Sequence, residues 1–103
     1  MVKYLPLGSI VLLKDGLQKL LIISRAINVR NGDQEYFFDY GGVGYPEGLI
    51  GDEMAYFNHD KINKVIFEGY SDVEDENIID SFNTYLKENP NIVKGDPETW
   101  NIE

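Results

Sequence analysis

The stretch KLLIISRAINVRNGDQEYFFDY, residues 19–40, decides the fold of this chain. Its first half, residues 19–29, is rich in isoleucine and is typical of a long β-strand. The Asn-Gly-Asp sequence at 31–33 indicates a hairpin, because asparagine and glycine tolerate the positive φ angles of tight turns. Residues 35–40 predict an aromatic strand. The aromatic side chains on one face of this strand are Tyr36, Phe38 and Tyr40.

Three further segments with strand character flank this hairpin. A short apolar strand is predicted at 9–14, and an Asp-Gly turn follows it. Two more strands are predicted at 53–57 and 64–70, with a single 3₁₀ turn at 58–62 between them. Five short strands in this layout predict a small five-stranded SH3-like barrel over residues 8–70. An OB-like barrel fits less well, because it usually places a helix between its third and fourth strands.

A C-terminal amphipathic helix is predicted at 72–88, where apolar residues recur with helical spacing. Ser71 or Asp72 can cap its start, and Pro90 ends it. The chain is therefore expected to be one mainly β (α+β) domain over residues 1–103. Its tail, 89–103, has Trp100 as an anchor. The predicted barrel core consists of Ile10, Leu12, Ile22, Phe38 and Ile66, with Ile78, Phe82 and Tyr85 of the helix closing it from outside.

Composition and charge exclude several classes of function. The 103 residues include 18 acidic and nine basic side chains, for a net charge of −9. Phosphate backbones and anionic lipids repel such a chain, so neither nucleic acid nor membrane is an expected partner. The chain has no cysteine, which excludes disulfides, thiolate nucleophiles and cysteine zinc sites. The apolar start lacks the basic cluster and cleavage site of a signal peptide, so a cytoplasmic location is expected.

The segment DYGGVGYPEGLIGD, residues 39–52, is rich in glycine. It is not a phosphate-binding loop, because no helical pattern follows it and its glycine spacing differs from known phosphate-binding motifs. No lysine or arginine lies between Arg30 and Lys61. The simplest interpretation is a connector between two strands. The alternative is a binding loop, in which Tyr40, Tyr45 and Tyr56 line an aromatic groove for a peptide.

His59 is the only histidine of the chain. With Asp60 it suggests a small hydrolase as one hypothesis. However, no serine occupies a nucleophile-elbow motif and no cysteine is present. Histidine in an Asn-His-Asp turn more often caps or bonds that turn. We therefore expect no catalytic residue, no metal site and no cofactor.

Three regions of the chain, taken together, resemble a known protein family. They are LPLGSIVLLKDG with KLLIISR (5–16 and 19–25), YFFDYGGVGYPEGLI (36–50) and FNHDKINKVIFEGY (57–70). They resemble small proteins of unknown function from Gram-positive bacteria, the DUF4176-like family. Genes of that family often lie beside LXG-type toxins that the type VII secretion system exports. The resemblance implies an accessory, adaptor or chaperone-like role and carries over no catalytic residue.

The leading hypothesis is thus a non-enzymatic protein-binding module that works with a secreted LXG toxin or its export machinery. The alternative is an acidic immunity protein, because an acidic inhibitor is steered toward basic toxins. The predicted binding residues are Tyr40, Tyr45, Pro46, Glu47, Tyr56 and His59.

Overall fold

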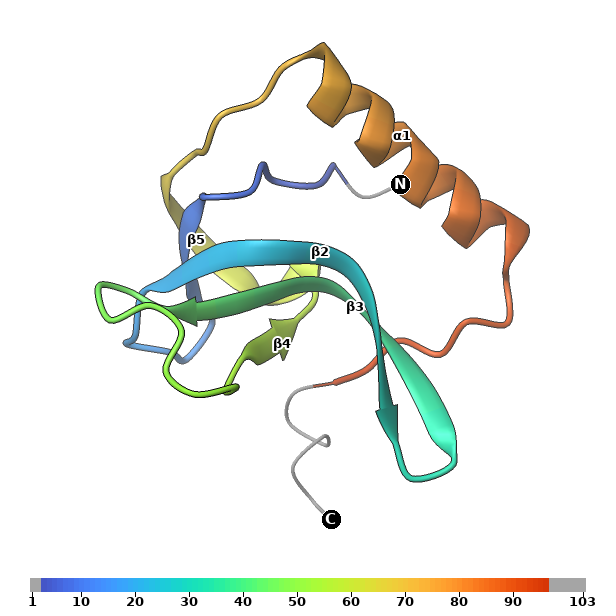
Figure 1. The fold of residues 1–103 in the computed structure, drawn as a ribbon, viewed down its shortest axis with the longest axis horizontal. Helices are drawn as coiled ribbons and strands as arrows, with labels where there is room; N and C mark the ends of the chain where they lie inside the picture. Colours follow the sequence, from blue (N-terminus) through green and yellow to red (C-terminus); the bar gives the residue numbers. More distant parts are fainter. Residues whose placement is uncertain (1–2, 97–103) are drawn as a thin grey trace.

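The computed structural model describes residues 3–96, which form one antiparallel β-sheet and one α-helix (Figure 1). The strands are β1 (Ile10–Leu13), β2 (Leu20–Asn31), β3 (Gln34–Gly44), β4 (Ala55–Phe57) and β5 (Ile62–Phe67). A 3₁₀ turn (His59–Lys61) precedes β5, and the helix α1 (Val73–Glu88) follows it. The prediction of a mainly β chain with five strands and a C-terminal helix is confirmed.

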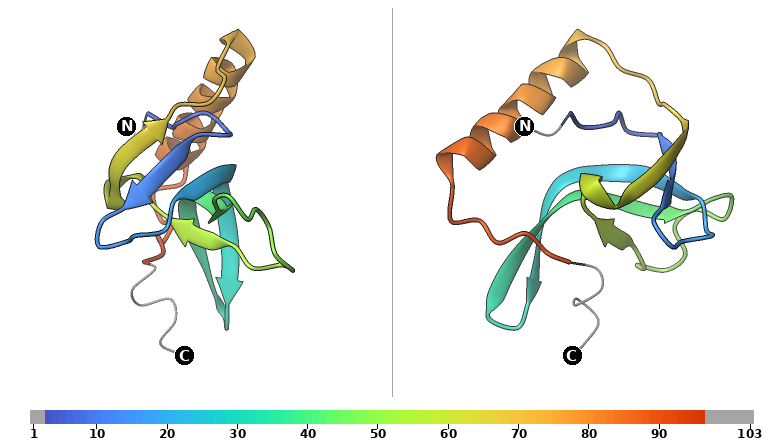
Figure 2. Two further views of the ribbon diagram at one scale, coloured as in Figure 1. Left: turned by 90° about the vertical axis from the view of Figure 1, so that its left-hand side faces the viewer. Right: turned by 180° about the vertical axis from the view of Figure 1, so that it is seen from behind.

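The sheet is open, so the predicted SH3-like barrel is not confirmed. Its strand order is β4-β3-β2-β1-β5, and no ladder joins β4 to β5 within residues 3–96. A closed barrel needs both end strands to pair with each other. Strand β4 has only three residues, and all three pair with β3. Figure 2 shows the long β2–β3 hairpin bending away from the other strands, and a register shift between Ile22 and Ser24 accompanies this bend.

The β2–β3 hairpin forms as predicted but extends further along the chain. Its register runs from Leu20 opposite Gly44 to Asn31 opposite Gln34. The first glycines of the glycine-rich segment therefore belong to β3 and not to a connector. A Cβ on Gly41 would lie 2.6 Å from Met54 Cε, and a Cβ on Gly42 would lie 3.1 Å from the Leu21 carbonyl oxygen. Close packing therefore favours glycine at both positions, most firmly at Gly42, where the near neighbour is backbone.

The main core lies between the sheet and the N-terminal residues, which run between α1 and β2 in Figure 1. Ile22 is buried there as predicted, but β1 turns the opposite set of side chains toward the core from the predicted set. Val11 is fully buried, whereas Ile10 and Leu12 are only partly buried. Ile66 is exposed because β5 is an end strand. The buried residues of this core are Tyr4, Val11, Leu20, Ile22, Tyr40 and Phe57.

Phe38 is also fully buried, as predicted, but it lies outside this core cluster. Its ring centroid lies 5.5 Å from that of Tyr56. Gly95 is packed so closely on the Phe38 ring that a Cβ there would overlap it. The predicted single core therefore does not hold Phe38, which is buried against Tyr56 and Gly95 instead.

Helix α1 begins as the sequence indicates. The Asp72 carboxylate caps it by accepting a hydrogen bond from the Asp75 backbone N–H at 3.0 Å. The helix is then fixed to β2 by Arg25, whose guanidinium lies 2.7 Å from the Asp75 carboxylate. Burial alone would raise the pKa of Asp75, but hydrogen bonds from Arg25 and Ser71 outweigh it and lower that pKa. This nearly buried ion pair sets the rotation of the helix.

The helix consequently packs through only one side of the predicted apolar stripe. Phe82 contacts the core as expected, and Ile79 joins it. Ile78 and Tyr85, which had been expected to close the core, are each 44% exposed. The packed face passes through Asp75, Ile79 and Phe82, because Asp75 must reach Arg25.

The chain after α1 returns to the sheet. The Phe37 backbone N–H donates to the Val93 carbonyl at 2.8 Å, and the Gly95 N–H donates to the Phe37 carbonyl at 2.9 Å. The first part of the predicted tail is therefore docked along β3. Trp100, the expected anchor of that tail, lies outside the described residues. Within the described chain, no helix combines the length and the apolarity that crossing a bilayer demands.

Candidate functional site

Polar side chains from four separate parts of the chain meet around Asp39 on β3. We call this cluster the polar centre. Its members are Tyr4, Asp39, Tyr40, Asn58, His59 and Lys94. The 3₁₀ turn and its preceding residue supply Asn58 and His59, while Tyr4 and Lys94 come from the two terminal segments.

The Asp39 carboxylate is 1% exposed, and both of its oxygens have donors. Oδ1 accepts from the Tyr4 hydroxyl at 3.1 Å and from Lys94 Nζ at 3.2 Å. Oδ2 accepts from the His59 backbone N–H at 2.9 Å. Asn58 completes the cluster, because its Oδ1 accepts from the Asp39 N–H at 2.9 Å and its Nδ2 donates to the Gly95 carbonyl at 2.7 Å. The carboxylate thus ties both terminal segments to β3.

Tyr40 follows Asp39 on β3, and its hydroxyl belongs to the same cluster. It accepts from the Leu5 backbone N–H at 2.9 Å and lies 2.7 Å from His59 Nδ1. Burial raises the pKa of Tyr40 to about 12, although the Leu5 hydrogen bond opposes this shift. Burial, followed by the nearby Asp39 charge, also raises the pKa of Tyr4. Both phenols therefore stay protonated at neutral pH and serve as hydrogen-bonding groups.

These raised pKa values predict a loss of stability in alkaline solution. The unfolded chain ionises its tyrosines near pH 10, before the folded chain does. The stabilising contribution is therefore complete below about pH 10 and is lost as the pH rises through about 12. We expect urea titrations to show this decline, with a smaller slope against pH in Tyr4→Phe. An unchanged slope in that variant would contradict the assignment.

The Tyr45-Pro46-Glu47-Gly48 turn lies at one end of the sheet, beside the β1–β2 turn, and the Tyr45–Pro46 peptide bond is cis. The Tyr45 N–H donates to the Lys19 carbonyl at 2.9 Å, and the Gly48 N–H donates to the Gly44 carbonyl at 2.7 Å. Lys19 also brings its ammonium 5.7 Å from the Tyr45 ring centroid. The loop is thus held by backbone hydrogen bonds, and a cation distant in sequence reaches it.

Large apolar side chains are exposed around this turn. Leu17, in the β1–β2 turn, is 98% exposed, and Leu49 and Ile50 are exposed in the loop after Gly48. Gln18 joins the two loops, because its Nε2 donates to the Tyr45 carbonyl at 3.1 Å. We call the set Leu17, Tyr45, Leu49 and Ile50 the apolar tip. A cavity of about 430 Å³ beside it is lined in part by Gln18, Val43, Glu47, Ile50 and Met54.

The structure does not gather the predicted binding residues into one groove. Tyr40 is fully buried against the core, and His59 is bonded to it. Tyr56 is paired with Gly41, the neighbour of Tyr40, so its side chain lies on the opposite face of the sheet. The three exposed together are Tyr45, Pro46 and Glu47.

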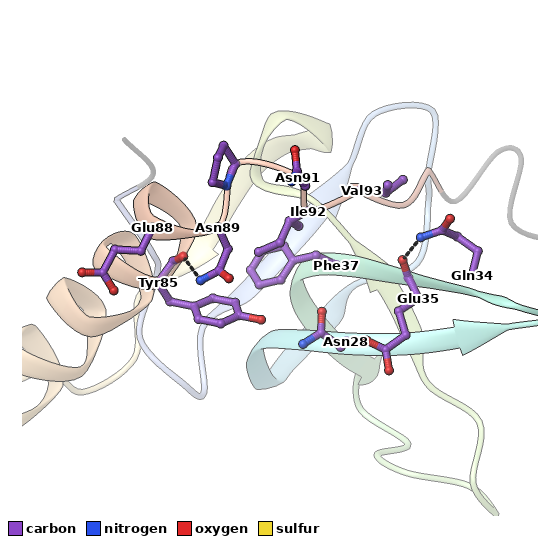
Figure 3. A pocket seen from close by; sticks show the side chains of 11 residues that line it. Asn28, Gln34, Glu35, Phe37, Tyr85, Glu88, Asn89, Asn91, Ile92 and Val93 are labelled. Atoms are coloured by element: carbon purple, nitrogen blue, oxygen red, sulfur yellow. Dashed lines mark hydrogen bonds between the residues drawn. The ribbon is translucent and has the colours of Figure 1, made fainter.

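A second cavity, of about 360 Å³, lies between the end of α1, the segment after it and the β2–β3 hairpin (Figure 3). The rings of Tyr85 and Phe37 point into it from opposite sides, and the amides of Asn28 and Asn89 lie beside them. Glu35 and Glu88 add carboxylates to its lining, which contains no lysine, arginine or histidine among the described residues. This lining does not suit a phosphate group.

A metal site of the usual composition is also not found in residues 3–96. No group of three or more histidine, aspartate and glutamate side chains lies close enough together there to hold an ion.

Comparison with protein families identifies the chain. The family model described as "Domain of unknown function (DUF4176)" matches residues 4–78. The chain belongs to this family. The match includes all five strands and the first part of α1. No curated protein and no solved structure matches the chain significantly.

The DUF4176 region contains most of the polar centre, since only Lys94 lies beyond residue 78. The sequence alone had not revealed this cluster, because its members are separated by up to 90 positions. One signal was present, namely a charged residue, Asp39, inside an aromatic strand. A carboxylate at such a position requires partners if it is buried.

Proposed function

We propose that this DUF4176 protein is a non-enzymatic protein-binding module, an adaptor or chaperone-like accessory of a type VII-secreted LXG toxin that acts in the cytoplasm. The observation that carries the proposal is the apolar tip. Its side chains are exposed, yet Tyr45 sits on a loop held by hydrogen bonds to Lys19 and Gln18. Exposed aromatic and aliphatic side chains on a pre-organised loop are suited to anchoring a protein partner.

The polar centre supports a non-enzymatic role. The Asp39 carboxylate accepts from Tyr4, Lys94 and the His59 backbone N–H, and the Tyr40 hydroxyl is bonded to the Leu5 N–H and to His59 Nδ1. Asp39 and Tyr40 have almost no exposed surface. A catalytic group must instead reach the proton or atom on which it acts.

The strand order also supports this function. We infer an SH3-like arrangement left open between β4 and β5, because β5 returns beside β1 after a 3₁₀ turn. SH3-like domains bind peptides through aromatic side chains near their loops.

We expect Tyr45→Ala to weaken partner binding by about 1–2 kcal/mol, because the ring is an exposed anchor. Isothermal titration calorimetry with the export region of the proposed LXG toxin partner measures this loss. Tyr70→Ala is the matched control, since Tyr70 is a more exposed tyrosine outside the tip. Both variants should keep the wild-type melting temperature within a few degrees. Unchanged affinity in Tyr45→Ala combined with Leu49→Asp would refute the tip as the binding surface.

An acidic immunity protein is the second candidate, and the charge around the tip favours it. Glu47, Asp52 and Glu53 lie in the same loop region, within a chain of net charge −9. Such a surface would attract a basic toxin domain, and added salt would weaken the complex. Co-expression separates the two candidates. An immunity protein rescues cells that express the mature toxin domain alone, whereas an adaptor changes only the export of the full toxin.

A further inference from the structure

Strand β5 ends the sheet, and within residues 3–96 no strand pairs with its outer edge. Among the described strands it pairs with β1 alone, and in the left-hand view of Figure 2 it is the outermost strand beside β1. Val65, Ile66 and Phe67 are all exposed, with Phe67 at 57%. Leu7, whose backbone lies against Gly69, adds another exposed apolar side chain nearby. Unpaired apolar edges of this kind favour pairing with a further strand.

The sequence of this edge is complementary to itself. It reads Lys64-Val65-Ile66-Phe67-Glu68, with a positive end, an apolar centre and a negative end. An antiparallel copy centred on Ile66 places Lys64 opposite Glu68 of the partner subunit, and Val65 opposite the partner's Phe67. Opposite charges and apolar pairs are the cross-strand combinations that stabilise sheets. A parallel, in-register copy would instead oppose Lys64 to its own counterpart, so the charges select the antiparallel arrangement.

We propose that β5 of one copy pairs antiparallel with β5 of a second copy, and that this pairing joins the two sheets in a twofold-symmetric dimer. Twofold symmetry makes such an interface close on itself, because each contact occurs twice and no free edge remains at the junction. The net charge of −9 on each copy opposes association, and the two Lys64–Glu68 contacts offset part of that repulsion at the interface. This inference is independent of the apolar tip and of its partner.

Disulfide trapping tests the position of the twofold axis. The chain has no cysteine, so Ile66→Cys introduces a single thiol that meets its own counterpart across the axis. Directly opposed antiparallel residues have Cα separations compatible with a disulfide. Leu17→Cys is the control, because Leu17 is 98% exposed and belongs to the β1–β2 turn and not to β5. Under mild oxidation we expect Ile66→Cys to form covalent dimer at least about tenfold faster than Leu17→Cys, since pairing raises the effective thiol concentration.

Sedimentation velocity over a range of concentrations tests the association of the unmodified chain and its charge pairing. We expect Lys64→Glu to shift the chain to monomer and Lys64→Glu combined with Glu68→Lys to restore the dimer. Both side chains are exposed, so the urea midpoint at low protein concentration should stay the same. Wild-type chain that remains monomeric at all concentrations would overturn the proposal, as would equal oxidation rates of the two cysteine variants. Failure of the double variant to restore the dimer would overturn the pairing centred on Ile66.

Discussion

Asp39→Ala is expected to lower the free energy of unfolding by about 3 kcal/mol, because it leaves buried donors without an acceptor. The Tyr4 hydroxyl loses its partner at 3.1 Å, and the His59 backbone N–H loses its partner at 2.9 Å. Alanine cannot replace either hydrogen bond, and water reaches this site poorly because Asp39 is buried. Urea titration followed by circular dichroism at neutral pH measures the change.

Two matched variants separate the causes of that loss. Asp39→Asn keeps the size of the side chain and one acceptor oxygen, so it should cost less than Asp39→Ala. Lys94→Met removes the ion pair to Asp39 and the contact of the ammonium with the Phe37 ring, whose centroid lies 5.8 Å away. Because Lys94 is 43% exposed, the expected loss is below about 1 kcal/mol. A gain in stability on replacing Asp39 would instead be the behaviour of a functional residue held at a cost to the fold. That result would contradict the structural role assigned to the polar centre.

The elements that the sequence predicted correctly depend on local signals. The β2–β3 hairpin follows from Asn31 and Gly32, where the turn needs a residue with positive φ. The start of α1 follows from Asp72, whose side chain caps the first turn. Each of these signals acts within a few residues, so no knowledge of the tertiary structure is needed to interpret it.

The incorrect predictions concern contacts between distant segments. The buried face of α1 is selected by Arg25, which lies 50 positions before its partner Asp75. The apolar residues of the helix cover two neighbouring faces, and their pattern alone does not show which face packs on the sheet. Which residues of β1 face the core likewise depends on how this strand pairs with β2 and β5. All residues of this short strand are apolar, so its sequence does not show which face is buried. The predicted closure of the barrel is wrong for the same reason. It depends on pairing between β4 and β5, which are distant in the sheet order.

The candidate binding surface was predicted in part. Tyr45, Pro46 and Glu47 were identified from the turn motif, and they are exposed together. Leu17 was missed, because it becomes a neighbour of Tyr45 only when Gln18 joins the two loops. An apolar residue placed directly after the Asp-Gly turn was the available signal, since such turns are usually polar.

Phe82→Ala is expected to destabilise the domain by about 3 kcal/mol, because it removes the main contact between α1 and the core. The Phe82 ring meets the Tyr4 ring edge-on, with centroids 5.3 Å apart. The Arg25 guanidinium lies over the same ring at 5.6 Å from its centroid. The truncation therefore weakens the aromatic packing and also exposes the Arg25–Asp75 ion pair to water. Chemical denaturation monitored by circular dichroism gives the loss.

Tyr85→Ala is the control that makes this experiment specific to the observed docking of α1. It removes an aromatic ring of similar size from the same helix, but Tyr85 is 44% exposed and lines the cavity of Figure 3 instead of the core. Its expected cost is below about 1 kcal/mol. If the helix docked on the face that the sequence pattern favoured, Tyr85→Ala would cost as much as Phe82→Ala. Comparable losses in the two variants would therefore contradict the packing of α1 through Asp75, Ile79 and Phe82.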